Sequence, residues 1–147
     1  MKKLLAVFLA AAMLFCFAGA AFAATNENSA EQTAATERLQ KLGIMQGDPD
    51  GAFRPQDQLT RAEFAKIAVI TAGLKAETEA KATEKAAFKD VKNNAWYTGY
   101  INTAYEHGFI KGYEDGTFRP SQNISEREVL TVVLRLLGYE NLSGTWP

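Results

Sequence analysis

The chain has 147 residues and carries 16 Lys and Arg against 17 Asp and Glu, which gives a formal net charge of −1. A nucleic-acid-binding protein presents a basic face, so this balance argues against that class. One Cys and one His exclude a disulfide framework and a cysteine metal site, and no Ser/His/Asp or Cys/His set stands out. We therefore predict no catalytic residue, no metal site and no cofactor.

Residues 1–23 have the pattern of a secretory signal peptide. Residues 2–3 are lysines, residues 4–17 are an apolar run, and residues 21–23 form a small-residue cleavage site. The apolar run is too short to cross a membrane, and no later run is long enough. Cleavage after residue 23 also removes Cys16, so we predict an exported chain without cysteine and without a membrane span.

The next segment combines a leader with a short helix. Residues 24–35 are rich in Ala, Glu, Thr and Asn, which predicts a flexible leader. Ala35, Leu39 and Leu42 then follow at helical spacing. Gly43 comes directly after them and is free to end the helix with a positive φ.

A loop and a second helix complete the first half of the chain. The loop at 47–55 contains an Asp-Gly turn and one large apolar residue, Phe53, which we expect to plug the core. Thr60 and Glu63 form a capping box, which predicts a helix from there to residue 71 or 72. Gly73 ends it. Its inner face is predicted to consist of Phe64, Ile67, Ala68 and Thr71.

Residues 75–87 are mostly Ala, Lys, Glu and Thr. Two interpretations are equally consistent with this composition: a solvated extension of the helix, supported by pairs such as Glu77 with Lys81, or a linker.

The second half repeats the same order of elements. Residues 96–105 have an aromatic face typical of a helix, which ends at Gly108. A glycine-rich loop follows, with brief strand pairing expected at 118–119 and at the matching 53–54. Ser125 and Glu128 form another capping box. The amphipathic helix that follows carries Val129, Val132, Val133, Leu136 and Leu137 on one face and ends at Gly138.

This correspondence is an internal repeat, because residues 43–73 align without a gap on residues 108–138. The identical positions are Gly43, Gly47, Asp50, Gly51, Phe53, Arg54, Pro55, Glu63 and Gly73. We predict an all-α fold of helix–loop–helix modules with short β-like loop segments. Module 1 spans residues 36–74 and module 2 spans residues 88–139.

The repeated motifs resemble those of the S-layer homology domain family. Module 2 reads Phe88-x-Asp-Val, then Trp96, then Gly-x-Ile-x-Gly-Tyr-x-Asp-Gly-Thr-Phe-x-Pro over residues 108–120. Module 1 carries the other signature of the family, Leu-Thr-Arg-Ala-Glu-Phe, at residues 59–64. The resemblance implies a bundle of such modules and a role as a non-covalent anchor of exported proteins on the bacterial cell wall. The implied ligand is a pyruvylated secondary cell-wall polysaccharide, bound in grooves between neighbouring modules.

The chain departs from the family pattern in its first module and in its module count. Module 1 lacks the Phe-x-Asp-Val and Trp lead-in, and it has Asp48-Pro49 where module 2 has Tyr113-Glu114. The family usually has three modules, so we expect an incomplete bundle. Residues 140–147 are interpreted as the opening of a third module, which the bundle acquires either in the same chain or from another chain.

Arg61 is the strongest candidate for ligand contact. A cation at the first helical position opposes the helix dipole, at a cost of about 0.3–1 kcal/mol. Module 2 has Glu126 there instead. An Arg fork matches the carboxylate of a pyruvate ketal, and free N–H groups at the helix start would add to anion binding. The alternative is a solvated charge. We expect Arg61→Ala to weaken binding and to leave the melting temperature unchanged or slightly raised, whereas a large loss of stability would make Arg61 structural.

The other candidates each have a structural alternative. Gly47 and Gly112 either bring the backbone close to a sugar or serve turn geometry. Trp96 and Tyr113 either stack on a sugar or pack in the core. Arg54 and Arg119 either line a groove or pair with the turn residues Asp50 and Asp115. The capping-box residues Thr60, Glu63, Ser125 and Glu128 are assigned a structural role.

Three functions follow as hypotheses. The first is the secreted wall-binding module just described. The second is a self-assembly module of a surface layer, without sugar binding. The third is the anchoring part of a larger surface enzyme, with no catalysis in these residues.

Overall fold

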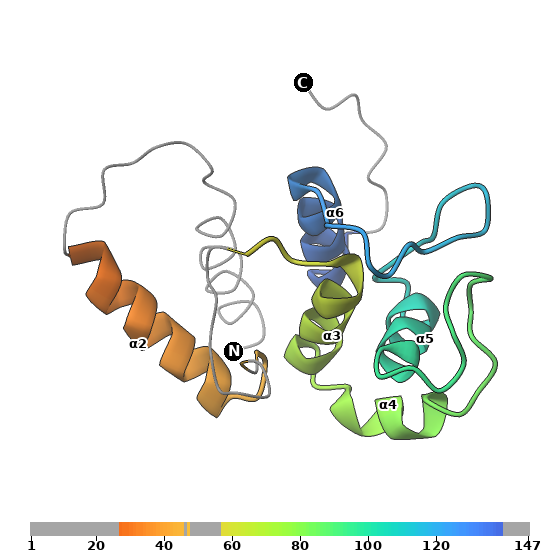
Figure 1. Cartoon of the computed structure of the whole chain (residues 1–147), viewed down its shortest axis with the longest axis horizontal. Coiled ribbons are helices and arrows are strands. Elements are labelled where there is room, and N and C mark those ends of the chain that lie inside the picture. Colours follow the sequence, from red (N-terminus) through yellow and green to blue (C-terminus); the bar gives the residue numbers. More distant parts are fainter. Residues whose placement is uncertain (1–26, 46, 48–56, 140–147) are drawn as a thin grey trace. The chain divides into compact units, whose positions relative to one another are not determined.

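The computed structural model describes residues 27–45, 47 and 57–139. Within these residues the regular elements are helices, which confirms the all-α class (Figure 1). They are α2 (Glu27–Lys41), α3 (Arg61–Thr71), α4 (Lys75–Lys81), α5 (Thr98–Glu106) and α6 (Glu126–Leu136). The chain divides between Gln58 and Leu59 into two compact units. The signal segment and the tail at 140–147 lie outside the described residues.

Helix α2 belongs to the first unit and starts earlier than the sequence predicts. It includes residues from Glu27 onward, which we expected to be part of a flexible leader. Glu, Gln and Ala are good helix formers, so a helix extends into this segment although no apolar stripe marks it. The Thr36 hydroxyl also donates to the carbonyl of Gln32, one helical turn earlier, at 2.8 Å.

Helices α2, α3, α5 and α6 end in the same way, each at one of the predicted glycines. After α2, for example, the Gly43 N–H donates to the Gln40 carbonyl and the Ile44 N–H donates to the Leu39 carbonyl. This is the Schellman motif, which requires a positive φ at the glycine. The four glycines have φ between 66° and 88°, namely Gly43, Gly73, Gly108 and Gly138.

The core of the second unit lies around α5. Helix α5 packs against α3 and α4, and α3 also contacts α6. Phe64, Ile67 and Ala68 of α3 are buried as predicted, and Thr71 is half-buried. On α6 the buried residues are Val129, Val132 and Val133, while Leu136 and Leu137 are half-buried. The amphipathic patterns therefore identify the inner faces of both helices.

The segment between the two modules begins with a helix and continues as an anchored turn. Helix α4 packs on α5 so closely that a side chain at Gly99 would overlap the Thr78 carbonyl. The Asn102 side chain then holds the following turn, because it accepts from the Ala87 N–H at 2.9 Å and donates to the Lys81 carbonyl at 3.1 Å. Residues 75–87 are thus fixed to α5 by both packing and hydrogen bonds.

The strand pairing expected at residues 118–119 does not form, and that prediction is wrong. Arg119 has a φ of 59°, which lies outside the strand region. The β-like contact is instead an isolated antiparallel bridge between Thr60 and Asn123. The matching segment at 53–54, together with the predicted plug Phe53, lies outside the described residues.

Helix α3 packs with the second module, although the repeat assigns it to the first. The Arg61 and Ala62 N–H groups donate to the carbonyls of Gln122 and Pro120 at 2.8 and 3.0 Å. The Ile124 N–H donates to the Leu59 carbonyl at 2.9 Å. The start of α3 is therefore joined by backbone hydrogen bonds to the loop that precedes α6.

Candidate ligand-binding site

The backbone at the start of α3 is already occupied. Because the first two N–H groups of the helix donate to Gln122 and Pro120, they are not available to an anion. The next N–H group, on Glu63, faces the Thr60 hydroxyl at 3.3 Å. The expectation that free N–H groups of this helix add to anion binding is therefore wrong. An anion near the start of α3 therefore has to be held by groups other than these three N–H groups.

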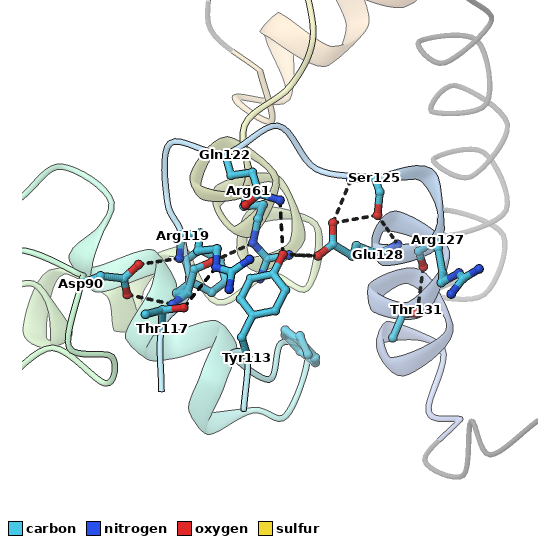
Figure 2. A network of polar contacts seen from close by, with 12 residues as sticks. Arg61, Asp90, Tyr113, Thr117, Arg119, Gln122, Ser125, Arg127, Glu128 and Thr131 are labelled. Carbon is cyan, nitrogen blue, oxygen red and sulfur yellow. Dashed lines mark hydrogen bonds and ion pairs between the residues drawn. The ribbon is translucent and has the colours of Figure 1, made fainter. Parts of the chain in front are cut away.

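Both capping boxes are present, but they differ in what else they do. Glu63 accepts from the N–H and hydroxyl of Thr60 through one oxygen, Oε2. Glu128 does the same for Ser125 through its Oε2 and has Oε1 left for other partners. Oε1 accepts from Arg61 and from the Tyr113 hydroxyl at 2.7 Å. Glu128 is therefore both a cap and the centre of a tertiary network (Figure 2).

Arg61 is buried, with only 7% of its surface exposed. Its Nε donates to the Phe118 carbonyl at 2.7 Å, and its Nη1 lies 2.5 Å from Oε1 of Glu128. The guanidinium carbon lies 4.7 Å from the ring centre of Tyr113 and 4.6 Å from that of Phe118. The alternative of a solvated charge is therefore wrong, since Arg61 connects α3 to the loop and to α6.

The loop on the other side of Tyr113 is held by two carboxylates. Asp115 accepts from the Thr117 N–H and hydroxyl and pairs with Arg119 at 3.1 Å. Asp90, the acid of the Phe-x-Asp-Val motif, accepts from the N–H groups of Phe118 and Arg119 at 2.8 and 2.7 Å. These bonds hold Arg119 in its left-handed conformation. They also fix the Phe118 peptide group whose carbonyl binds Arg61.

A pocket of about 300 Å³ opens beside Arg61, between α3, the segment 110–118 and α6. We call it the basic pocket, because among the described residues four cationic side chains and a single carboxylate, Glu128, line it. The cationic residues are Arg61, Lys111, Arg127 and Arg135. Gly112, Tyr113 and Thr131 also line it.

Sequence reasoning missed three of these cations. Arg127 and Arg135 lie on one face of α6 with Thr131 between them, at spacings of four residues. That basic stripe was visible in the sequence. Lys111 carried no such signal, because only the fold of the loop brings it opposite α6.

The network sets the ionisation of its members. Burial by itself raises the pKa of the Glu128 carboxyl, but the hydrogen bonds from Ser125 and Tyr113 and the charge of Arg61 outweigh burial and lower it. Burial, followed by the hydrogen bond to Glu128, raises the pKa of the Tyr113 phenol. At neutral pH the site therefore holds an ionised Glu128 and a protonated Tyr113.

Asp115 gives a direct test of the loop structure. The Thr117 hydroxyl and N–H, followed by Arg119, lower the pKa of Asp115 from 3.8 to about 2. Because this pKa is lowered, the stabilisation is complete above the unfolded value of about 3.9 and is lost as the pH falls through about 2. We expect Thr117→Ala to raise the pKa of Asp115 toward 3.8 and Thr117→Ser to leave this pKa low. NMR titration of the Asp115 carboxyl measures both. Equal titration curves in the wild type and in Thr117→Ala would contradict the described turn.

The remaining sequence candidates are placed as follows. Gly112 serves packing, because a side chain there would overlap the ring of Phe88 and the Thr117 carbonyl. Trp96 is 57% exposed, so the core-packing alternative is wrong, but it does not line the basic pocket. No described contact of Gly47 assigns a role to it. Arg54 lies outside the described residues.

The described ranges, 27–45, 47 and 57–139, offer no candidate for a metal site or a membrane span. They contain no cluster of three or more His, Cys, Asp or Glu that would hold a metal ion. They also contain no helix with the length and apolar character needed to span a membrane.

Comparison with known proteins gives one family. The sequence pattern of the S-layer homology domain matches residues 37–65 and 87–130. Over the whole chain, a surface layer protein of Brevibacillus choshinensis is 34% identical and a middle cell wall protein of Brevibacillus brevis is 35% identical. A cellulosome-anchoring protein of Acetivibrio thermocellus is 34% identical over 75% of the chain. No solved structure matches significantly.

These matches cover all or most of this chain but only a part of each relative. The chain spans 14% and 15% of the two Brevibacillus proteins and 24% of the cellulosome-anchoring protein. The relatives are surface-layer and cell-wall proteins, which confirms the predicted location at the bacterial cell surface. On the pattern matched in both halves and on these relatives, the chain belongs to the S-layer homology domain family.

Proposed function

We propose that the chain anchors an exported protein to the bacterial cell wall by binding an acidic wall polysaccharide in the basic pocket. The observation that supports this most strongly is the excess of positive charge in that pocket. Family membership and the cellulosome-anchoring relative support the anchoring role.

Among the described residues, acids neutralise only part of the positive charge of the basic pocket. Glu128 is the one carboxylate among the described lining residues, and it is paired with Arg61. Arg135 donates to a backbone carbonyl, that of Phe109, at 3.3 Å. Within the described part of the chain, no ion pair joins Lys111 or Arg127 to an acid. These cations are available to an anionic ligand.

The pocket suits a carboxylate that is carried on a sugar. Its volume of about 300 Å³ is at the small end of ligand sites, which suits a single sugar residue rather than a long segment of polymer. A guanidinium presents a planar fork of donors that fits a carboxylate with two parallel hydrogen bonds. A pyruvate ketal places such a carboxylate rigidly on the ring. We therefore propose that the pyruvyl group is contacted by Arg127, Arg135 and Lys111. Arg61 lines the inner side of the pocket behind this group.

Co-sedimentation with cell-wall sacculi tests this function. We expect the chain without residues 1–23 to sediment with sacculi that carry pyruvylated polysaccharide. Binding should be lost after the ketals are removed by mild acid, and also after the polysaccharide is removed. Equal binding to bare peptidoglycan would contradict the acidic-sugar mechanism.

Removal of the exposed cation of α6 should separate binding from stability. We expect Arg127→Ala to weaken binding to sacculi about tenfold or more, because a charge-assisted hydrogen bond contributes about 1.5–3 kcal/mol. The melting temperature should not change, since Arg127 is exposed. The matched control is Lys89→Ala, which removes an exposed cation outside the pocket and should bind normally. Equal weakening by both variants would indicate a general effect of charge.

A further inference from the structure

One peptide group in the loop before α6 has a charged side chain bound at each end. This group joins Phe118 to Arg119. Its N–H, on Arg119, donates to Oδ2 of Asp90 at 2.7 Å. Its carbonyl, on Phe118, accepts from Nε of Arg61 at 2.7 Å. Figure 2 shows Asp90 and Arg61 on either side of this part of the loop. Because a peptide group is planar and stiff, the two side chains are connected through one rigid unit.

Asp90 determines how this peptide group is oriented. Its other oxygen, Oδ1, accepts from the Phe118 N–H at 2.8 Å, so one carboxylate holds two consecutive N–H groups. Arg119 has a φ of 59°, which is unfavourable for a residue with a Cβ atom. The two bonds to Asp90 offset this strain. If one of them is lost, we expect Arg119 to relax toward a negative φ, and the peptide group that precedes it turns at the same time.

Arg61 depends on the carbonyl of this peptide group, because a guanidinium is a planar fork of donors. Nε binds the Phe118 carbonyl and Nη1 binds Oε1 of Glu128. Two bound nitrogens fix the plane of the guanidinium, whereas the bond to Glu128 alone would leave it free to rotate. Arg61 lines the basic pocket, so the orientation of its guanidinium sets the shape and the charge distribution on one side of the pocket.

The charges at the two ends of the peptide group act in the same direction. The carboxylate of Asp90 at the N–H and the guanidinium of Arg61 at the carbonyl both polarise the group, so each hydrogen bond strengthens the other. Asp90 is not among the described residues that line the basic pocket. An effect of Asp90 on a ligand there therefore has to pass through the loop and Arg61.

We propose that Asp90 is a positioning residue of the basic pocket, which orients Arg61 through the peptide group between Phe118 and Arg119. The inference rests on the proposed function and extends it to a residue outside the pocket. Asp90 belongs to the lead-in of module 2, whereas Arg61 belongs to module 1. The affinity of the pocket therefore depends on a contact between the two modules.

Asp90→Asn tests this role on the chain without residues 1–23. The new amide has one acceptor oxygen and one donor group, so one of the two loop N–H groups loses its acceptor. By NMR, we expect the Arg61 Nε–H to exchange faster with water than in the wild type. Binding to sacculi that carry pyruvylated polysaccharide should weaken about five- to tenfold, which corresponds to the loss of about one hydrogen bond.

Asp115→Asn is the matched control, because it removes the same charge from the same loop. Asp115 accepts from Thr117 and pairs with the Arg119 side chain, and it has no bond to the peptide group between residues 118 and 119. We expect the Arg61 Nε–H to exchange at the wild-type rate in this variant and binding to exceed that of Asp90→Asn. Equal changes in both variants would reduce the role of Asp90 to its charge. A lower melting temperature of Asp90→Asn with wild-type binding would make Asp90 structural only. Either result overturns the proposal.

If Asp90→Asn does not fold, scalar couplings across hydrogen bonds in the wild type decide. We expect one coupling from the Arg119 amide to the Asp90 carboxyl carbon and another from the Arg61 Nε to the Phe118 carbonyl carbon. Absence of either coupling overturns the proposal. Failure of these predictions leaves the proposed function standing, provided that the wild type binds pyruvylated sacculi. If the wild type does not bind them, the proposed function fails and the role of Asp90 in binding fails with it.

Discussion

Arg61→Ala is expected to lower the free energy of unfolding by about 2–4 kcal/mol. The substitution removes a buried cation that has a hydrogen bond to Phe118, an ion pair with Glu128 and two aromatic rings around it. It also leaves Glu128, which is partly buried, without its cationic partner. Urea unfolding at neutral pH measures the effect. We expect binding to sacculi to be lost as well, because the residues that line the basic pocket beside Arg61 are then no longer held in place.

This expectation reverses the one drawn from the sequence, in which Arg61→Ala leaves the melting temperature unchanged or raised. The helix-dipole term is about 0.3–1 kcal/mol, which is smaller than the loss of a buried ion pair and its hydrogen bonds. Arg127→Ala is the matched comparison, since it removes the same kind of charge from the same pocket at an exposed position. If the two variants unfold at the same urea concentration, Arg61 has no structural role and the described network is wrong.

Gly112→Ala is expected to lower the free energy of unfolding by about 2–3 kcal/mol, because an added methyl group overpacks the core. The added methyl group would overlap the ring of Phe88, and it would lie 2.6 Å from the Thr117 carbonyl oxygen. Phe88 is buried and stacked on Phe118, so a shift of its ring would disturb that packing. Gly112 also lines the basic pocket, so we expect weaker binding to sacculi as well.

Two comparisons identify the cause. Gly116→Ala adds the same methyl group to the same loop, where φ is 75° and no atom lies within 4 Å of it. That variant should lose only about 1–2 kcal/mol, from backbone strain. In a double-mutant cycle, Phe88→Ala should remove most of the additional effect of Gly112→Ala. A larger loss for Gly116→Ala than for Gly112→Ala would contradict the packing explanation.

The sequence predicted those features that depend on neighbouring residues. The capping boxes at Thr60 and Ser125 each need only a hydroxyl and a carboxylate three residues apart. The helix ends at Gly43 and Gly108 need only a residue that accepts positive φ. The buried faces of α3 and α6 follow from helical periodicity. For the same reason the repeat and its motifs were sufficient to indicate the family.

The candidate site was predicted only in part. Arg61 was selected because it opposes the local preference of a helix start, and it does line the basic pocket. Its burial was not predicted, because Phe118 and Glu128, which bind it, are distant in sequence. Gly112 was assigned to a turn or a sugar contact, but Phe88 is what requires a glycine there. For Trp96 the sequence left stacking and core packing open, and its exposure excludes the second.

The sequence by itself determined α3, α5 and α6, the capping boxes and inner faces of α3 and α6, and the family of this protein, because each depends on spacings of a few residues along the chain. Only the tertiary structure decided what the charged residues do. It buried Arg61 between α3 and the second module and placed Lys111 opposite Arg127 and Arg135. The physical reason is that burial and charge pairing depend on which distant segments meet, and a local pattern carries no information about that.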